Sequence, residues 1–258
     1  MSRIDQARKG YLGKNIRDTN KAHSKSVIHQ SLHKEKHITS FNLPEIILGG
    51  QDGLVNVLGV ILGVAAATSS SQIVIVAGLA ATFAESISMA AVAYTSKLAE
   101  ADYYQSELER EAWEIQNVPD GEREEIRALY ENYGFKGKTL NEIVNKITSD
   151  KQIWLKVMME QELKLEETDR KQAFPSAFIV GISSLIGSII PLIPFFFFYI
   201  QSAIFISIIA SAIVLFSVGY YKAKVTIGRS FIKNGIEMML IGIISALVGY
   251  VIGNFLKV

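Results

Sequence analysis

The chain has 258 residues, 49% of them hydrophobic, and a formal net charge of +1. It contains no cysteine, which excludes disulfides and thiolate metal sites. Three long stretches, 53–84, 172–221 and 238–256, have no charged residue. Runs of this length predict membrane-spanning helices, because a helix satisfies its own backbone hydrogen bonds in hydrocarbon. We therefore do not expect a soluble protein.

The near-neutral total hides two regions of opposite charge. Residues 1–43 hold nine Lys or Arg against three Asp or Glu, together with all four histidines. We interpret them as a polar cytoplasmic tail, with a histidine-rich metal-collecting arm as the alternative. Residues 97–171, which we call the insert, hold 18 of the 25 acidic residues against twelve basic ones. An acid-rich segment between apolar stretches indicates a cationic partner.

Five membrane spans are predicted in chain order. The first covers about 44–68, and the second runs from 73 to about 96 after a short uncharged turn. No Gly or Pro occurs over 87–118, so the second span is predicted to continue without a break into a charged helix over 98–116. The third runs from about 174 to the proline-rich segment 191–198. The fourth runs from a turn at 201–202 to 221, and the fifth covers about 235–255.

The insert is predicted to be helical, because it has no alternating strand pattern. A turn over 118–121 starts a helix that ends near Tyr133, with Asp120 as its N-cap. The next helix is expected to start near Thr139, where Thr139 and Glu142 have the spacing of a capping box. A last helix is expected over 152–168.

Basic residues lie almost entirely in the tail, the insert and a loop over 222–233. By the positive-inside rule these parts face the cytoplasm, and the C-terminus faces the opposite side. The predicted fold is an all-α membrane protein with five transmembrane helices and a helical cytoplasmic metal-binding insert between helices 2 and 3. The predicted domains are the tail (1–43), helices 1–2 (44–96), the insert (97–171) and helices 3–5 (172–258).

Three side chains within the spans are candidate metal ligands. Asp52 lies about one turn inside the first span, where a charge costs about 3 kcal/mol on insertion scales and so indicates function. The alternative is an interfacial Asp that caps a helix start. Glu85 and Met89 are four residues apart and share a face of the second span. A carboxylate followed by a thioether suits a divalent transition-metal ion.

Acidic pairs in the insert have the spacing of one helix face. Glu111 and Glu114 form one such pair, and Glu122 and Glu125 form another. Carboxylate pairs on facing helices bind Fe or Mn in helical bundles. The alternative is a solvated acidic face, which is our interpretation for four further residues: Glu107, Glu109, Glu124 and Glu131.

Two methionines accompany these carboxylates. Met158 and Met159 precede Glu162 by four and three positions, again on one helix face. The insert has no histidine, so the Glu-x-x-His pairs of ferritin-like oxidases are absent and zinc is disfavoured. Carboxylates with thioethers favour Fe²⁺ or Mn²⁺ over Ca²⁺ or Mg²⁺.

Small residues recur at four-residue spacing in the first and fifth spans. Gly59 and Gly63 form one pair, and Gly249 and Gly253 form the other. This spacing permits close helix contact, either within the chain or between two copies of it.

At these residues the chain strongly resembles the vacuolar iron transporter family, which includes plant and yeast vacuolar iron importers. The similar segments occur in family order and cover about 44–256. They are Gly50-Gln-Asp-Gly-Leu-Val-Asn56, Ser88-Met-Ala-Ala91, Ala101-Asp-Tyr-Tyr104, Glu107-Leu-Glu-Arg-Glu111, Val118-Pro-Asp120, Trp154-Leu-Lys-Val-Met-Met159, Glu162-Leu163 and Pro191-Leu-Ile-Pro194.

The resemblance implies a five-span homodimer whose ion path lies between the first spans of the two subunits, lined by Asp52 and Met89. It also implies that the insert is a metal-binding domain and that Fe²⁺, often with Mn²⁺, leaves the cytosol in exchange for protons. One departure is that Ala81 stands where plant members carry a Glu, and Glu85 is the candidate replacement. The ligands implied in the insert are Glu111, Glu114, Glu122, Glu125, Met158, Met159 and Glu162.

We therefore expect a secondary transporter rather than an enzyme, with no catalytic residues and no permanently bound cofactor. Its substrates would be Fe²⁺ or Mn²⁺ and protons, in a plasma membrane if the source is prokaryotic and a vacuolar membrane if it is eukaryotic. We expect a lipid bilayer and a second copy of the chain as partners, and no nucleic acid. The alternatives are a membrane-anchored ferroxidase-like protein and a metal sensor on a channel for another cation.

Overall fold

A computed structural model of the chain describes residues 9, 11, 13, 15–24, 27, 42–226 and 230–256. These residues form helices and connecting turns, and no strand occurs among them. Most of the N-terminal tail lies outside the described residues, including three of its four histidines. The part that is described contains a short helix, α2 (Ile16–Ala22). The interpretation of the tail therefore stays a prediction.

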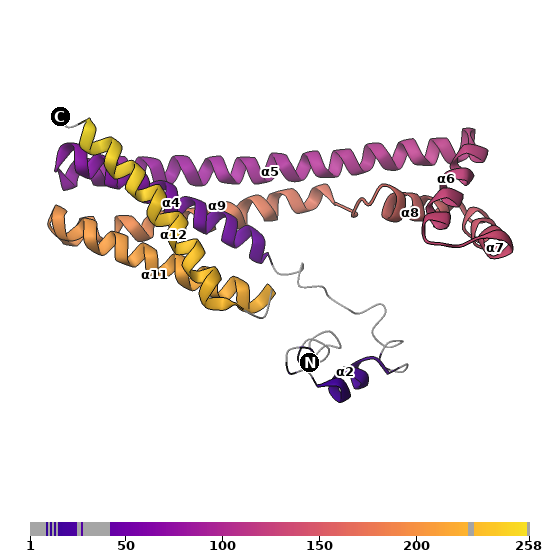
Figure 1. The fold of residues 1–258 in the computed structure, drawn as a ribbon. Coiled ribbons are helices and arrows are strands. Elements are labelled where there is room, and N and C mark those ends of the chain that lie inside the picture. Colours follow the sequence, from indigo (N-terminus) through magenta and orange to yellow (C-terminus); the bar gives the residue numbers. More distant parts are fainter. Residues whose placement is uncertain are drawn as a thin grey trace. The chain divides into compact units, whose positions relative to one another are not determined.

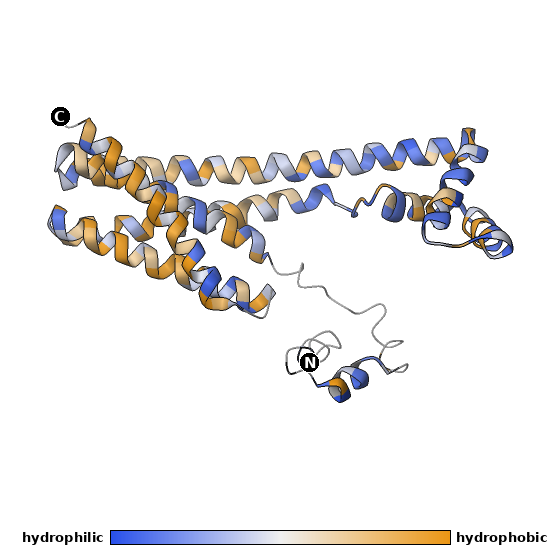
Figure 2. Cartoon of the chain, in the orientation of Figure 1, coloured by the Kyte–Doolittle hydropathy of each residue, from blue (hydrophilic) through white to orange (hydrophobic). Residues whose placement is uncertain are grey.

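Five helical segments of the described chain are long and apolar enough to cross a membrane, which confirms the predicted number of spans (Figures 1 and 2). The protein is thus a multi-pass membrane protein. In the third segment a short 3-10 turn, Arg170–Gln172, precedes the α-helices. The segments are α4 (Leu43–Thr68), α5 (Ser71–Asn117), Arg170–Phe197 with α9 (Ala173–Leu192) and α10 (Pro194–Phe197), α11 (Ile200–Thr226) and α12 (Phe231–Phe255).

Helix α5 is a single helix of 47 residues, which confirms the predicted continuity of the second span and the charged helix. At 1.5 Å per residue it is about 70 Å long. The hydrocarbon core of a bilayer is only about 30 Å thick, so about half of the helix lies outside it. Its apolar part ends before Lys97, and the charged part that follows belongs to the insert.

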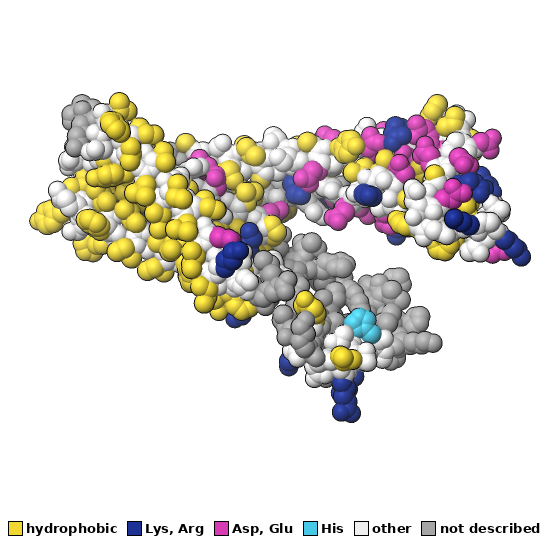
Figure 3. All heavy atoms as spheres, in the orientation of Figure 1, with side chains coloured by type: hydrophobic (Ala, Val, Ile, Leu, Met, Phe, Trp, Pro, Cys, Tyr) yellow, Lys and Arg dark blue, Asp and Glu magenta, His cyan; other side chains and the backbone are white. Residues whose placement is uncertain are grey.

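The chain divides into two compact units, which we describe separately. The membrane unit contains 1–89 and 179–258, and the insert unit contains 90–178. In the membrane unit α4 supplies more buried apolar side chains than any other described helix, among them Val57, Leu58 and Ile61. Many large apolar side chains on the other helices are exposed, as expected of lipid-facing surfaces, and they cover the visible face of this unit (Figure 3).

Helix α4 contacts α9 through glycines. A Cβ added at Gly49 would lie 2.2 Å from the Val180 carbonyl oxygen, and one added at Gly53 would lie 2.4 Å from that of Ser184. No real Cβ approaches backbone this closely, so the two backbones touch only because glycine has no side chain. The face of α4 that carries these glycines is therefore covered within the chain.

Helix α4 contacts α12 through the two predicted glycine pairs. A Cβ at Gly249 would lie 2.2 Å from the Gly59 carbonyl oxygen, and one at Gly253 would lie 1.9 Å from that of Gly63. The two small-residue motifs therefore pack against each other within one chain. At these four residues the small-residue spacing thus serves packing within one chain rather than contact between two copies.

The insert unit is built from α6 (Pro119–Asn132), α7 (Gly137–Thr148) and α8 (Lys151–Val157), together with the end of α5. Helix α8 passes directly into a π-helical turn, Met158–Glu162. Its N-cap is Asp150, whose carboxylate accepts hydrogen bonds from the backbone N–H groups of Gln152 and Ile153. The helices surround an apolar core made of Ile115, Ile126, Leu140, Val144, Ile147, Trp154 and Met158.

Two predicted helix starts in the insert are wrong. Helix α6 is capped by Val118 rather than Asp120, because Pro119 has its φ angle already set for the first helical turn. Helix α7 starts at Gly137, two residues before Thr139, so the predicted capping box does not form.

The last predicted helix of the insert is also too long, because it ends at Glu162 rather than at Thr168. Lys164 adopts a left-handed conformation with φ 55°. This turn allows the backbone N–H of Leu165 to donate to the Met159 carbonyl oxygen at 2.9 Å. Such a bond satisfies a free carbonyl at a helix end.

Alanine at Gly253 should destabilise the membrane unit by roughly 1–3 kcal/mol, because its Cβ would overlap the Gly63 backbone. The matched control is Gly59→Ala, whose Cβ would meet only the Ser245 carbonyl oxygen, at 3.8 Å. Thermal unfolding of the purified protein in detergent measures both variants. Equal melting temperatures for the two variants would contradict the proposed close contact.

Candidate metal sites

Three glutamates from two helices of the insert unit converge, and we call them the carboxylate cluster: Glu111, Glu114 and Glu122. One carboxylate oxygen of each lies within 4.8 Å of those of the other two. Glu111 is only 1% exposed and Glu122 only 4%. The cluster is thus brought together from α5 and α6 and largely removed from solvent.

The sequence explains why these carboxylates point inward. Glu111 lies four residues before Ile115, and Glu122 lies four residues before Ile126. Residues at this spacing share a helix face, and both isoleucines are buried in the apolar core of the insert unit. The packing of α5 against α6 that buries the isoleucines therefore also brings the carboxylates together.

Two oxygens of the cluster lack a hydrogen-bond donor in the described part of the chain. The Oε2 atoms of Glu111 and Glu122 are buried, and no donor among the described residues hydrogen-bonds to either. Burial first, and then the charges of Glu111 and Glu125, raise the pKa of Glu122 to about 7. Burial also raises the pKa of Glu111, although the neighbouring Arg110 opposes this shift. A bound cation would relieve both effects.

The other predicted ligands of the insert differ in their surroundings. The pKa of Glu162 is raised by burial and then by the charge of Glu125, so these two carboxylates are electrostatic neighbours. Met158 is fully buried in the apolar core. Met159 lines a hollow of about 710 Å³ together with Tyr104. The structure therefore groups three glutamates tightly, and the roles of the other four residues stay predictions.

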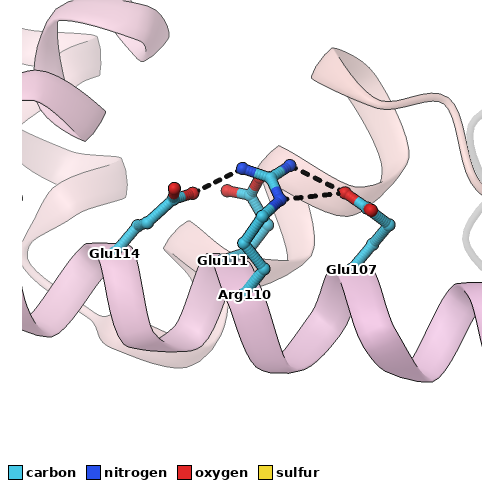
Figure 4. Close-up of polar contacts among 4 residues, drawn as sticks. All are labelled: Glu107, Arg110, Glu111 and Glu114. Carbon is cyan, nitrogen blue, oxygen red and sulfur yellow. Dashed lines mark hydrogen bonds and ion pairs between the residues drawn. The ribbon is translucent and has the colours of Figure 1, made fainter.

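Arg110 is a member of this site that the sequence analysis missed (Figure 4). Its guanidinium donates to Glu107 through Nε at 3.0 Å and Nη2 at 2.8 Å. It also pairs with Glu111 at 2.7 Å and with Glu114 at 2.5 Å. Glu107, which we had interpreted as a solvated surface residue, is thus the anchor of an arginine that reaches the cluster. The sequence did carry a signal for these contacts, because Glu107 and Glu114 lie at i,i+3 and i,i+4 spacing from Arg110.

A second group of polar side chains lies in the membrane unit. Asn56 donates from Nδ2 to Asp52 Oδ2 at 3.3 Å, one turn along α4. The carboxyl of Glu85, on α5, lies close enough to both side chains to interact with them electrostatically. We call Asp52, Asn56 and Glu85 the membrane cluster. Met89 lies one turn beyond Glu85 and is half-buried, and its role stays a prediction.

The alternative interpretation of Asp52 as a helix cap is wrong. Helix α4 begins at Leu43, with Asn42 as its N-cap and Pro44 in the first turn. Asp52 therefore lies more than two turns inside the helix. Its side chain interacts with Asn56 and Glu85 rather than with free backbone N–H groups.

Known proteins are similar to this chain over segments that include both clusters. The model of the VIT family matches residues 43–254. Vacuolar iron transporter 1 of Eucalyptus grandis is 37% identical over 216 residues, which cover 83% of this chain and 86% of that protein. Vacuolar iron transporter 1 of Arabidopsis thaliana is 33% identical over 227 residues, covering 87% and 90%. Vacuolar iron transporter of Plasmodium berghei (strain Anka) is 30% identical over 271 residues, covering 99% and 97%.

Metal binding at the carboxylate cluster should weaken as the pH falls, because a proton on Glu122, with its pKa of about 7, competes with the ion. Below pH 7 the Mn²⁺ affinity should fall by about tenfold per pH unit, and above it the affinity should level off. Titration of the purified protein with Mn²⁺ from pH 5.5 to 8 measures this. Glu122→Gln should bind more weakly with a flatter profile.

The matched control for this titration is Glu131→Gln, which removes an exposed carboxylate from the same helix, α6. It should reproduce the wild-type profile. An unchanged affinity between pH 5.5 and 7.5 in the wild-type protein would contradict the role of Glu122.

Proposed function

This chain belongs to the VIT family, and we propose that it transports Fe²⁺, and also Mn²⁺, out of the cytosol in exchange for protons. The observation that carries the proposal is the membrane cluster, where two carboxyl groups and an amide from α4 and α5 meet. Ionisable groups inside a membrane-spanning unit are costly and typically mark an ion or proton pathway. The relatives' printed name, vacuolar iron transporter, supports iron as the substrate.

The ligand chemistry of both clusters supports a divalent transition metal. The membrane cluster offers carboxylate and amide oxygens, and Met89 adds a thioether one turn along α5. The carboxylate cluster offers oxygens alone, and two buried methionines lie in the same unit. Oxygen ligands accept Fe²⁺ and Mn²⁺ equally well, and thioether sulfur favours the softer transition metals over Mg²⁺ and Ca²⁺.

Proton exchange follows from the proximity of Asp52 and Glu85. Two carboxylates in contact repel each other, and either a metal ion or a proton relieves that repulsion. The two cations therefore compete for the same oxygens. Binding of the metal from one side and of protons from the other would make the exchange obligatory, and this is the mechanism we propose.

The insert would collect the ion on the cytoplasmic side and deliver it to Asp52 and Met89. Basic residues of the insert and of the segment 222–233, which contains the end of α11 and the start of α12, support this orientation through the positive-inside rule. For the assembly we propose a homodimer with the path between the two copies of α4. Asp52 is only half-buried and Asn56 is exposed in a single chain, which is consistent with that arrangement. The relatives' names support a vacuolar membrane.

Flux through purified protein in sealed liposomes tests the proposal. Fe²⁺ under reducing conditions is added outside, a pH-sensitive dye is enclosed, and Mn²⁺ is added as a competitor. We expect iron entry together with proton movement in the opposite direction, and inhibition by Mn²⁺. Tight iron binding without flux would overturn transport, and flux without any pH dependence would overturn antiport.

Replacement of Asp52 by alanine should abolish this flux and leave the fold intact, because it removes one of the two carboxyl groups of the membrane cluster. The matched control is Glu237→Ala on α12. That exposed carboxylate pairs only loosely with Lys233, at 3.8 Å, and should be dispensable. Wild-type flux in the Asp52 variant would rule out its role.

A further inference from the structure

Arg110 is a cation of the protein itself that already occupies part of the carboxylate cluster. It contacts two of the three cluster members, Glu111 and Glu114. We propose that Arg110 is an internal counter-cation of the cluster. This inference rests on one part of the proposed function, namely that the cluster binds a metal ion. Arg110 competes with the arriving metal ion for the carboxylate oxygens, keeps the affinity low enough for release, and reduces the preference for trivalent over divalent ions.

The contacts of Arg110 place it in competition with a metal ion. Glu114 Oε2 accepts a hydrogen bond from Nη1 of Arg110, and Glu111 Oε1 forms an ion pair with Nη2. A metal ion bound through either of these two oxygens would need lone pairs that now face the guanidinium. An ion inside the cluster would also lie beside a second positive charge in a partly buried region, where repulsion is poorly screened. Arg110 therefore competes with the ion at Glu111 Oε1 and Glu114 Oε2, and its withdrawal frees both oxygens.

The arrangement gives the guanidinium a place to withdraw to. Glu107 is not part of the cluster, yet it accepts from both Nε and Nη2 of Arg110. The Arg110 side chain is 44% exposed, whereas that of Glu111 is 2% exposed. Arg110 can therefore release the buried carboxylates and stay bound to Glu107 at the solvent side. This makes Glu107 the anchor that keeps the competing cation close.

The charge of Arg110 also reduces the preference of the cluster for trivalent over divalent ions. Three ionised glutamates carry a formal charge of −3, and Arg110 reduces the local charge to −2. Repulsion between Arg110 and a bound ion grows in proportion to the charge of the ion. Loss of Arg110 should therefore strengthen binding of a trivalent ion more than that of a divalent one. A surface arginine that only forms weak exposed ion pairs would not change the ratio of the trivalent to the divalent affinity.

Metal titration of the full-length protein in detergent at pH 7.5 tests the proposal, with Mn²⁺ as the divalent probe and Tb³⁺ as the trivalent probe. In Arg110→Gln we expect affinity gains of about tenfold for Mn²⁺ and about thirtyfold for Tb³⁺, because the effect scales with ion charge. Arg110→Lys keeps the charge and should stay within about threefold of wild type for both ions. It also tests the role of the charge if the Gln variant folds poorly.

The matched control is Arg127→Gln, since Arg127 pairs with the exposed Glu124 outside the cluster. It should leave both affinities unchanged. Unchanged or weaker binding in Arg110→Gln, or equal gains for the two ions, would overturn the role of Arg110. Absence of Mn²⁺ binding to the wild-type protein would overturn metal capture by the cluster and this inference with it. The expected affinity shifts without any liposome flux would support the Arg110 role and overturn transport.

Discussion

Close approach of like-charged carboxyl groups is the constraint on which both candidate sites depend. Glu111 and Glu122 lie on the same helix faces as Ile115 and Ile126, so formation of the apolar core forces them together. Desolvation and mutual repulsion make the ionised pair unfavourable, and a cation relieves both. A proton, Arg110 or a metal ion can each supply the missing charge. The site is therefore a place of exchange between cations rather than a permanent cage for one.

The same constraint acts in the membrane unit, where the helices pack in a different way. Glycines of α4 allow α9 and α12 to approach its backbone, and these contacts cover the corresponding parts of its surface. Asp52 and Asn56 keep their contacts with Glu85 on α5. Because α4 is held both by close backbone contacts at its glycines and by buried apolar side chains, its polar face is rigidly placed. That rigidity favours a defined position for two carboxyl groups in an apolar environment.

The two clusters suit two different steps of transport. In our proposal, Arg110 competes with the metal ion at the carboxylate cluster, lowers its affinity and permits its release. The membrane cluster has no basic side chain among its three members, so a metal ion and protons are its natural counter-charges. An ion would then move from a site where it displaces an arginine to one where it displaces protons. Weak capture followed by proton-coupled release fits a transporter better than a storage or oxidation site.

The sequence by itself determined the five spans, the unbroken α5 and the pairing of acidic residues on single helix faces, because these features follow from local periodicity and from the absence of Gly and Pro. It also singled out the three glutamates of the carboxylate cluster, and Asp52 and Glu85 as separate candidates. Local pattern misplaced the starts of α6 and α7, where Pro119 and a turn outweighed side-chain capping, and it missed the π-helical turn after α8. Only the tertiary structure decided that the glycine motifs pair within the chain, that Asn56 joins Asp52 and Glu85, and that Arg110 enters the cluster. These contacts depend on which helix faces meet, and no local pattern encodes that choice.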